Sequence, residues 1–269
     1  MKFQLILGPC VMESYDHVMY CAEKIKSLTY DLSADVTFKA SFDKANRTDI
    51  HAFRGPGLEE GCRWLESVKK DLDFRVTTDV HETAQVSVLA EVVDIIQIPA
   101  FLCRQTDLLV AAGKTDVVVN IKKGQFVAPE DMKYAVNKVK SSGNESVWLT
   151  ERGSSFGYKN LVVDFRSFQW MQAYGPVIYD ATHSLQLPQS GSGVSGGLRS
   201  FIPSLARAAV AAGVDGLFIE THPDPANAKS DAATVWPMHQ LRDLVSQCVD
   251  LSQYMRDMKL VELESSCNL

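Results

Sequence analysis

Short runs of β-branched and aliphatic residues recur along the chain, separated by amphipathic or alanine-rich stretches. Eight such runs predict strands, at residues 3–9, 36–40, 75–79, 95–100, 117–122, 147–151, 177–181 and 217–220. Their near-continuous apolar character is typical of parallel strands that are buried on both faces. Strands that alternate with helices over this length predict an α/β protein with a closed (β/α)8 TIM barrel, a fold of typically about 250 residues.

The intervening stretches carry helix signals. Ser14 and Asp16 can cap a helix over residues 14–28, and "PED" is a good start for a helix over residues 129–141. Further helices are expected at 59–70 and 237–258. An open doubly wound sheet is the rival architecture, but no GxGxxG follows the first strand. We expect one barrel domain over residues 1–269 with a polar C-terminal tail, since no linker or short repeat divides the chain.

Composition narrows the class of protein. The longest apolar stretch is interrupted by Arg207 and Asp215, and the N-terminal run lacks a small-residue cleavage site, so neither a membrane span nor a signal peptide is expected. Six cysteines without a CxxC pair favour reduced thiols, and so a cytoplasmic protein. A formal charge of -6 argues against nucleic acid or an anionic membrane as the main partner. An anionic substrate would therefore need a local basic cluster.

Polar residues close most of the predicted strands. In a barrel the chemistry lies at the carboxyl ends of the strands, so these side chains should meet at one mouth. They are Cys10, Lys39, Lys44, Asp79, Gln97, Lys122, Arg152, Asp180, His183, Glu220 and Asp231. Buried polar groups destabilise a fold unless they find partners, so this set predicts a site and not a core.

Each of these residues also has a purely structural explanation. These are a core thiol at Cys10, a helix cap at Asp79 for a helix starting near His81, loop amides satisfied by Glu220 and His222, a solvated turn at Lys122 and Lys123, and an ordinary polar loop at "SFDKANRTD". The functional interpretation depends on the barrel bringing all the strand ends together.

Two kinds of chemistry emerge from the set. Five cations, namely Lys39, Lys44, Arg47, Lys122 and Arg152, suit phosphates or carboxylates and predict a phosphorylated substrate. Separately, a thiolate, an imidazole and two carboxylates suit a divalent transition metal with an open coordination position. These candidate ligands are Cys10, His183, Glu220 and Asp231.

A glycine- and serine-rich stretch, "LQLPQSGSGVSGGLRSF", follows His183. Residues 187–200 are rich in glycine and serine, which pack poorly in a core, and are expected to remain mobile. Their position after the seventh strand makes them a candidate lid over the site.

Longer motifs carry a specific resemblance. The segments "GPC", "FKASFDKANR", "TTDVHE", "IIQIPAFLCRQTDL", "VNIKKGQF", "LTERGSSFGY", "VIYDATHSLQLP" and "ETHPDPANAKSDA" resemble the 3-deoxy-D-manno-octulosonate 8-phosphate synthases nearly end to end. The resemblance implies a barrel enzyme that condenses phosphoenolpyruvate with D-arabinose 5-phosphate and water. It also implies a cytoplasmic homotetramer that serves lipopolysaccharide synthesis.

The resemblance assigns roles to particular positions. It implies that Lys39, Lys44, Lys122 and Arg152 hold phosphoenolpyruvate, and that Asn46, Arg47 and Thr48 hold the pentose phosphate, with Thr48 standing where the family commonly has serine. Gln97 joins the substrate-binding set, and Arg104 matches a residue that reaches a neighbouring subunit's site. From the charges that develop in the reaction, we expect Asp79, His183 and Lys44 to be catalytic.

Two alternatives remain open at this stage. The related 3-deoxy-D-arabino-heptulosonate 7-phosphate synthases use a four-carbon aldehyde and carry "KPRT" where this chain reads "KANRT", which favours the five-carbon sugar. A barrel kept only as an anion-binding module would show gaps in the polar set, and none is found.

The family also contains metal-free members with asparagine at the position of Cys10. This chain resembles the metal-dependent class, and zinc, iron, manganese or cobalt would suit the ligands.

Overall fold

The computed structural model describes residues 1–187 and 196–259. Parallel strands form a closed barrel, because the last one, β12, pairs back onto the first, β1. In order around the barrel the strands are β1 (Phe3–Gly8), β2 (Ala34–Lys39), β3 (Arg75–Asp79), β4 (Ile95–Ile98), β5 (Val118–Lys122), β6 (Val147–Glu151), β9 (Val177–Asp180) and β12 (Gly216–His222). Each lies on one of the eight predicted runs, so the TIM barrel prediction is confirmed.

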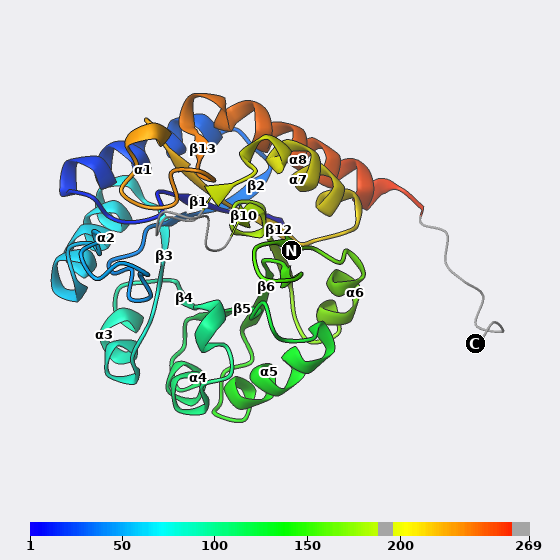
Figure 1. Ribbon diagram of the computed structural model, residues 1–269, viewed down its shortest axis with the longest axis horizontal. Helices are drawn as coiled ribbons and strands as arrows, with labels where there is room; N and C mark the ends of the chain where they lie inside the picture. The colour runs from blue at the N-terminus through cyan, green and yellow to red at the C-terminus, as the bar shows by residue number, and fades with distance from the viewer. Residues whose placement is uncertain (188–195, 260–269) are drawn as a thin grey trace.

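Helices surround the ring of strands (Figure 1). They are α1 (Tyr15–Thr29), α2 (Leu58–Leu72), α3 (Val86–Ala90), α4 (Thr106–Gly113), α5 (Met132–Lys140), α6 (Arg166–Gln172), α7 (Ile202–Ala211) and α8 (Leu241–Asp257). The loops between these elements contain two-residue strands, namely β7 (Ser154–Ser155), β8 (Leu161–Val162), β10 (Gln186–Leu187), β11 (Gly196–Gly197) and β13 (Trp236–Pro237).

The helix starts follow the predicted caps with one exception. Ser14 caps α1 by accepting a hydrogen bond from the His17 backbone N–H at 3.1 Å. The helix expected near His81 begins later, as a 3-10 turn over Thr83–Gln85 that has Glu82 at its N-cap position and leads directly into α3. Asp79 is therefore not a helix cap, and its carboxylate is available for other contacts.

Both faces of the strands are buried. Along β1, Leu5 and Leu7 belong to the large core between strands and helices, whereas Ile6 points into the barrel. There it packs in a smaller cluster with Ile95, Trp148, Ile178 and Phe218. The barrel interior is thus filled with side chains, and the site must lie at its mouth.

Gly8 allows the first two strands to approach closely at that mouth. A Cβ atom at this position would lie only 1.8 Å from the backbone oxygen of Lys39. Because glycine has no Cβ, the end of β1 can lie against the end of β2. As a result Lys39 Nζ reaches the Cys10 backbone oxygen at 3.0 Å.

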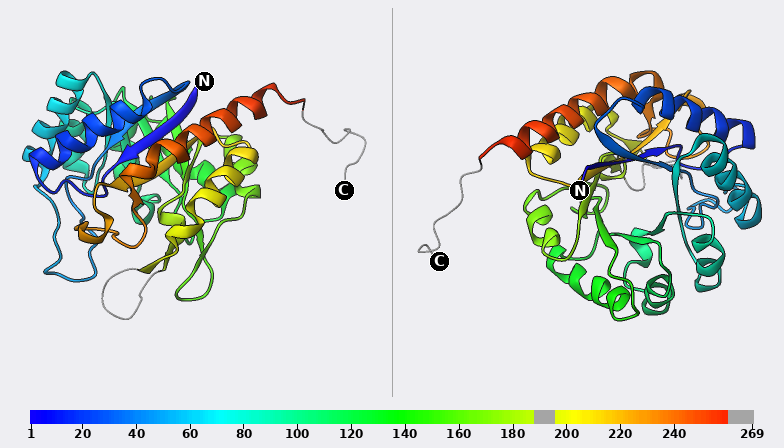
Figure 2. Two further views of the ribbon diagram at one scale, coloured as in Figure 1. Left: turned by 90° about the horizontal axis from the view of Figure 1, so that it is seen from above. Right: turned by 180° about the vertical axis from the view of Figure 1, so that it is seen from behind.

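The loops that follow β2 and β12 extend from the same end of the barrel, as the side view in Figure 2 shows. Most of the predicted lid lies outside the described residues, as does the polar tail from residue 260 onward. None of the helices in the described ranges is long and apolar enough to cross a membrane.

Candidate active site

Three predicted metal ligands lie together where the barrel closes. Gly8 pairs with Glu220 in the β1–β12 ladder, so Cys10, just beyond β1, lies beside Glu220. Asp231 comes from the loop after β12. The ligand atoms of Cys10, Glu220 and Asp231 lie within 4.8 Å of one another. A thiol and two carboxylates far apart in the sequence therefore form one cluster.

His183 completes this cluster from the end of β9. Its Nε2 lies 3.4 Å from Asp231 Oδ2 and 3.5 Å from Glu220 Oε2. Asp180 orients the ring, because its Oδ2 lies 2.7 Å from Nδ1. Burial alone would lower the pKa of His183, but Asp180 and Glu220 raise it. The imidazole is thus held with Nε2 directed at the two carboxylates.

The surroundings of the cluster fit a cation. Glu220 Oε2 is buried and makes no hydrogen bond, although most buried polar atoms have a partner. Burial, followed by the negative charges of Asp231 and Glu220, raises the pKa of Cys10 well above its usual value. A divalent cation among these four residues would satisfy Glu220 and favour the thiolate. Sulfur, nitrogen and carboxylate oxygen together match the donors that transition metals take in proteins.

Four predicted anion-binding residues lie at the same mouth: Lys39, Lys122 and Arg152 are buried, and Lys44 is partly buried. Lys39 Nζ donates to Glu220 Oε1 at 2.6 Å, and Lys122 Nζ donates to Asp180 Oδ2 at 2.7 Å. Both ammonium groups lie near the ring of Phe218, with Lys122 Nζ 3.8 Å from its centroid. The aromatic ring of Phe218 thus makes cation–π contacts with both ammonium groups, which stabilise their charge.

Lys44 and Arg152 add the remaining positive charge. Lys44 Nζ donates to Ser41 Oγ at 2.8 Å. Burial would lower the pKa of Lys44, but Cys10, Asp79 and other nearby acids raise it, so the ammonium stays charged. One terminal nitrogen of Arg152 donates to Gln186 at 2.7 Å, and the other is buried without a partner. Arg152 therefore has donors available for an anion.

Asp79 and Gln97 lie side by side at the ends of β3 and β4. Asp79 Oδ2 accepts from His81 Nε2 at 2.9 Å, while Asp79 Oδ1 and Gln97 Oε1 are buried without partners. Burial would raise the pKa of Asp79, but Lys44 and His81 lower it well below its usual range. Asp79 is thus an ionised carboxylate with one unused acceptor oxygen.

The structural alternative for the two lysines at the end of β5 is wrong. Lys122 is 6% exposed and Lys123 is fully buried, so "KK" is not a solvated turn. Lys123 Nζ lies 3.5 Å from Glu151 Oε1 and donates to Ser154 Oγ at 3.0 Å. Lys122 belongs to the mouth, whereas Lys123 stabilises the loop behind it. For His222 the structural explanation holds in part, because its Nδ1 accepts from the Asp224 backbone N–H.

The predicted pentose phosphate residues lie at the edge of this cluster. Asn46 and Thr48 are exposed. Arg47 donates to the backbone oxygens of Phe53 and Lys229. Arg104 is exposed outside the mouth and lines a pocket with Phe126 and Tyr134. The roles of these four residues stay predictions.

Two residues that contact the cluster were not predicted. Gln186 joins Arg152 to Asp231, donating to Asp231 Oδ1 at 2.9 Å. Ser230 Oγ lies 2.9 Å from Cys10 Sγ. Both are uncharged, and neither ends a strand of the barrel. The only weak sequence signal is a glutamine between two leucines at Gln186.

Comparisons with known proteins agree on the type of protein. A family model described as the DAHP synthetase I family matches residues 1–257. A protein of Koribacter versatilis named 2-dehydro-3-deoxyphosphooctonate aldolase is 56% identical over 255 residues, covering 94% of this chain and 92% of its own. Proteins of the same name from Syntrophotalea carbinolica and Helicobacter pylori are 53% and 52% identical, over 94% and 92% of this chain and 91% and 94% of theirs.

Proposed function

This chain belongs to the DAHP synthetase I family, and we propose that it condenses phosphoenolpyruvate with D-arabinose 5-phosphate and water. The products are 3-deoxy-D-manno-octulosonate 8-phosphate and inorganic phosphate, the reaction of the relatives named 2-dehydro-3-deoxyphosphooctonate aldolase. The observation that carries this proposal is the gathering of Lys39, Lys44, Lys122 and Arg152 at the mouth, together with an ionised Asp79 whose pKa is lowered, despite burial, by Lys44 and Lys39. The product would serve lipopolysaccharide synthesis.

The cationic residues would bind the enol substrate. Phosphoenolpyruvate carries a phosphate and a carboxylate, and Lys39, Lys44, Lys122 and Arg152 provide charge for both. Arg152 suits an oxyanion especially well, because its planar guanidinium can donate two parallel hydrogen bonds. Holding both anions fixes the enol relative to the aldehyde, and such positioning lowers the barrier of a bimolecular step.

The bond changes define what the other residues must do. C3 of the enol forms a bond to the aldehyde carbon, whose oxygen takes a proton, while water adds to C2 and loses a proton. The C–O bond to phosphate then breaks, and C2 becomes a ketone. Positive charge at C2 and negative charge on the aldehyde oxygen both need stabilisation during these steps.

We assign the water to Asp79. Its free Oδ1 can accept a hydrogen bond from water, but its low pKa makes it a weak base, so we infer that it orients the water. Lys44 lies close enough to Asp79 to lower its pKa, and it would donate a hydrogen bond toward the negative charge that develops on the aldehyde oxygen. His183 directs Nε2 at Glu220 and Asp231, which favours a role in binding a cation.

We propose that Cys10, His183, Glu220 and Asp231 hold a divalent metal ion such as zinc, iron, manganese or cobalt. When bound, the metal would supply Lewis acidity toward an oxygen of a substrate. Lys39 neutralises Glu220 through its 2.6 Å contact and keeps this carboxylate in place. Asp180 fixes the orientation of the His183 ring through its contact with Nδ1.

We propose a cytoplasmic homotetramer for the assembly. The five cysteines of the described ranges are free thiols, as expected in a reducing compartment. Arg104 is surrounded by exposed aromatic residues, since Phe101, Phe126 and Tyr134 are 55%, 62% and 58% exposed. Aromatic side chains and arginine are enriched at protein interfaces, and Arg104 would reach the neighbouring site there. Sedimentation of wild type and Arg104→Ala would test this assembly.

The substrate is tested by comparing aldehydes. We expect turnover of arabinose 5-phosphate to exceed that of erythrose 4-phosphate clearly at equal concentrations. A preference for the four-carbon sugar would instead indicate the heptulosonate reaction. The metal is tested by exhaustive chelation and restoration with each divalent ion. Full activity without metal, unchanged by added ions, would contradict the cation site and leave the substrate result standing.

A further inference from the structure

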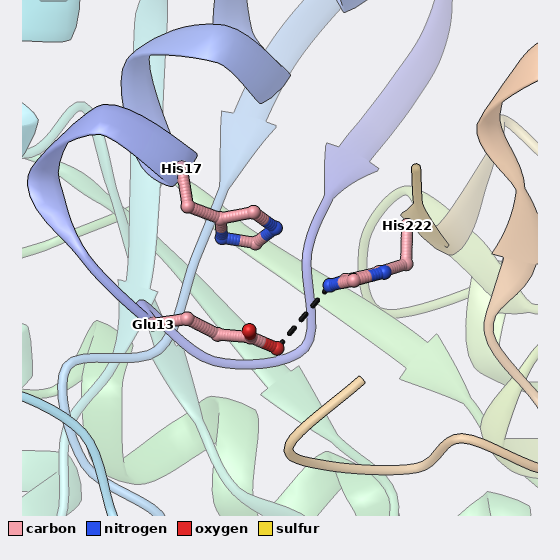
Figure 3. A group of neighbouring side chains, drawn as sticks. All are labelled: Glu13, His17 and His222. Atoms are coloured by element: carbon pink, nitrogen blue, oxygen red, sulfur yellow. Dashed lines mark ion pairs between the residues drawn. The ribbon is translucent and has the colours of Figure 1, made fainter. Parts of the chain in front are cut away.

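A second group of side chains lies next to the cation cluster, formed by Glu13, His17 and His222 (Figure 3). Glu13 lies between β1 and α1, three residues after Cys10. His222 ends β12, two residues after Glu220. His222 Nε2 lies 3.2 Å from Glu13 Oε1, and the rings of His17 and His222 have centroids 4.8 Å apart. The group thus joins the two chain segments that supply the cation cluster.

The tautomer of His222 argues against a second metal at this group. Its Nδ1 accepts the Asp224 backbone N–H at 3.0 Å, so a neutral ring carries its proton on Nε2. A protonated Nε2 cannot ligate a metal. The His222 side chain is 7% exposed, so the 3.2 Å contact between its Nε2 and Glu13 Oε1 is shielded from water, although its geometry is not that of a hydrogen bond.

The same carboxylate oxygen holds the loop that carries Asp231. Glu13 Oε1 accepts the Lys229 backbone N–H at 2.9 Å, and the Lys229 carbonyl accepts from Arg47 at 3.0 Å. Lys229 is followed directly by Ser230 and Asp231, both of which contact Cys10 Sγ. Lys229, which leads into the cation cluster, is therefore held at both its backbone N–H and its backbone carbonyl.

Asp231 needs such support. Its backbone adopts φ +51°, a left-handed conformation that is unfavourable for a residue with a Cβ. Such a conformation persists only where surrounding contacts impose it. The contacts at Lys229, two residues before Asp231, hold the chain there, while Gln186 holds the Asp231 side chain.

We propose that Glu13 is a positioning residue, which fixes the Asp231 loop against the end of β1 and so sets the spacing of Asp231 and Cys10 for the cation. The inference rests on the proposed metal site, because it concerns how the site receives its ion. Glu13 itself does not touch the cluster. Its effect passes through the Lys229 peptide on one side and through His222 on the other.

The test uses cobalt(II) as the probe, because a cobalt–thiolate bond gives a charge-transfer absorption that reports Cys10. Affinity is measured by competition with a chelator in wild type, Glu13→Ala, Glu13→Gln and the control Glu23→Ala, which changes an exposed acid of the nearby helix α1. We expect Glu13→Ala to bind cobalt about 10–100-fold more weakly. The cobalt affinity of Glu13→Gln should lie between those of Glu13→Ala and wild type, since an amide oxygen can still accept from the Lys229 N–H. The cobalt affinity of Glu23→Ala should match that of wild type.

Saturating cobalt should largely restore kcat in Glu13→Ala, because all four ligands remain. Wild-type affinity together with an unchanged thiolate band in both Glu13 variants would overturn the positioning role. A second cobalt equivalent that disappears with Glu13→Ala would also overturn it, in favour of direct ligation. Wild type without any thiolate band would instead contradict the proposed metal site itself, and the positioning role with it.

Discussion

The side-chain amide of Gln186 donates a hydrogen bond to Asp231 Oδ1 over 2.9 Å. Its carbonyl oxygen accepts from Arg152 at 2.7 Å. One amide thus connects a residue proposed to bind phosphoenolpyruvate with a residue proposed to bind the metal. These two partners also determine the orientation of the amide, because only its oxygen can accept a hydrogen bond from the guanidinium of Arg152.

Gln186→Glu should separate these two contacts. The new carboxylate can still accept from Arg152 but faces the Asp231 carboxylate with like charge. We expect metal affinity to fall about 10–100-fold, with a smaller change in the KM for phosphoenolpyruvate. Gln186→Leu removes both contacts and should affect both quantities. Chelator competition and steady-state kinetics measure the two effects, and equal behaviour of both variants would contradict the bridging role.

Asp180→Asn should disturb His183 and Lys122 together. Asp180 Oδ2 accepts from both residues at 2.7 Å, and Oδ1 accepts from Thr182 Oγ1 and the His183 backbone N–H. An amide has only one acceptor oxygen, so it cannot keep both sets of contacts. Burial would raise the pKa of Asp180, but His183 and Lys122 lower it well below its usual range, so the wild-type group is a carboxylate. We expect metal affinity about 10–100-fold weaker and kcat reduced. Retention of both by a folded variant, checked by circular dichroism, would contradict this role.

The strands, and the clustering of Cys10, His183, Glu220 and Asp231, could be predicted from the sequence, because apolar runs mark buried strands and closure of the barrel brings their ends together. Glu220 and Cys10 illustrate this: they are distant in the chain and adjacent in space. Gln186, Ser230 and Glu13 could not be predicted in this way. They act through loop geometry, which no periodic pattern encodes. The burial of Lys123 was likewise hidden, since its partner Glu151 lies on the neighbouring strand.

Lys123→Met should destabilise the fold and leave the site intact. The buried ammonium lies 3.5 Å from Glu151 Oε1, which also accepts the Gly153 N–H at 2.6 Å. Removing one partner leaves the other charge buried, at a cost of about 3–5 kcal/mol. Replacing both, as in Lys123→Met with Glu151→Gln, should recover part of the loss. Chemical denaturation of the single and double variants measures this coupling, and strictly additive losses would exclude it.

Asp79 should make the stability of the protein dependent on pH in the acid range. Lys44 and His81 depress its pKa in the folded state despite burial, whereas an unfolded aspartate titrates near about 3.9. A depressed folded pKa means that the stabilising contribution is complete above the unfolded pKa and is lost as pH falls toward the folded value. Asp79→Asn should lower the free energy of unfolding by about 1–3 kcal/mol near neutral pH. The difference from wild type should shrink below pH of about 4, and a constant difference would argue against an ionised Asp79.

Cys10→Asn should weaken metal dependence more than activity. Family members without metal carry asparagine at this position, and an amide can occupy the space beside Ser230 and Asp231, which lie 2.9 Å and 3.2 Å from Cys10 Sγ. Asparagine cannot supply a thiolate, so cobalt should bind the variant weakly and without a charge-transfer band. Lys39, Lys44, Lys122 and Arg152 are unchanged, and chelation should therefore reduce turnover of arabinose 5-phosphate less in the variant than in wild type. The result that would contradict this prediction is a variant that still binds metal at wild-type affinity yet has lost all activity, because Cys10 would then act in the chemistry and not as a ligand.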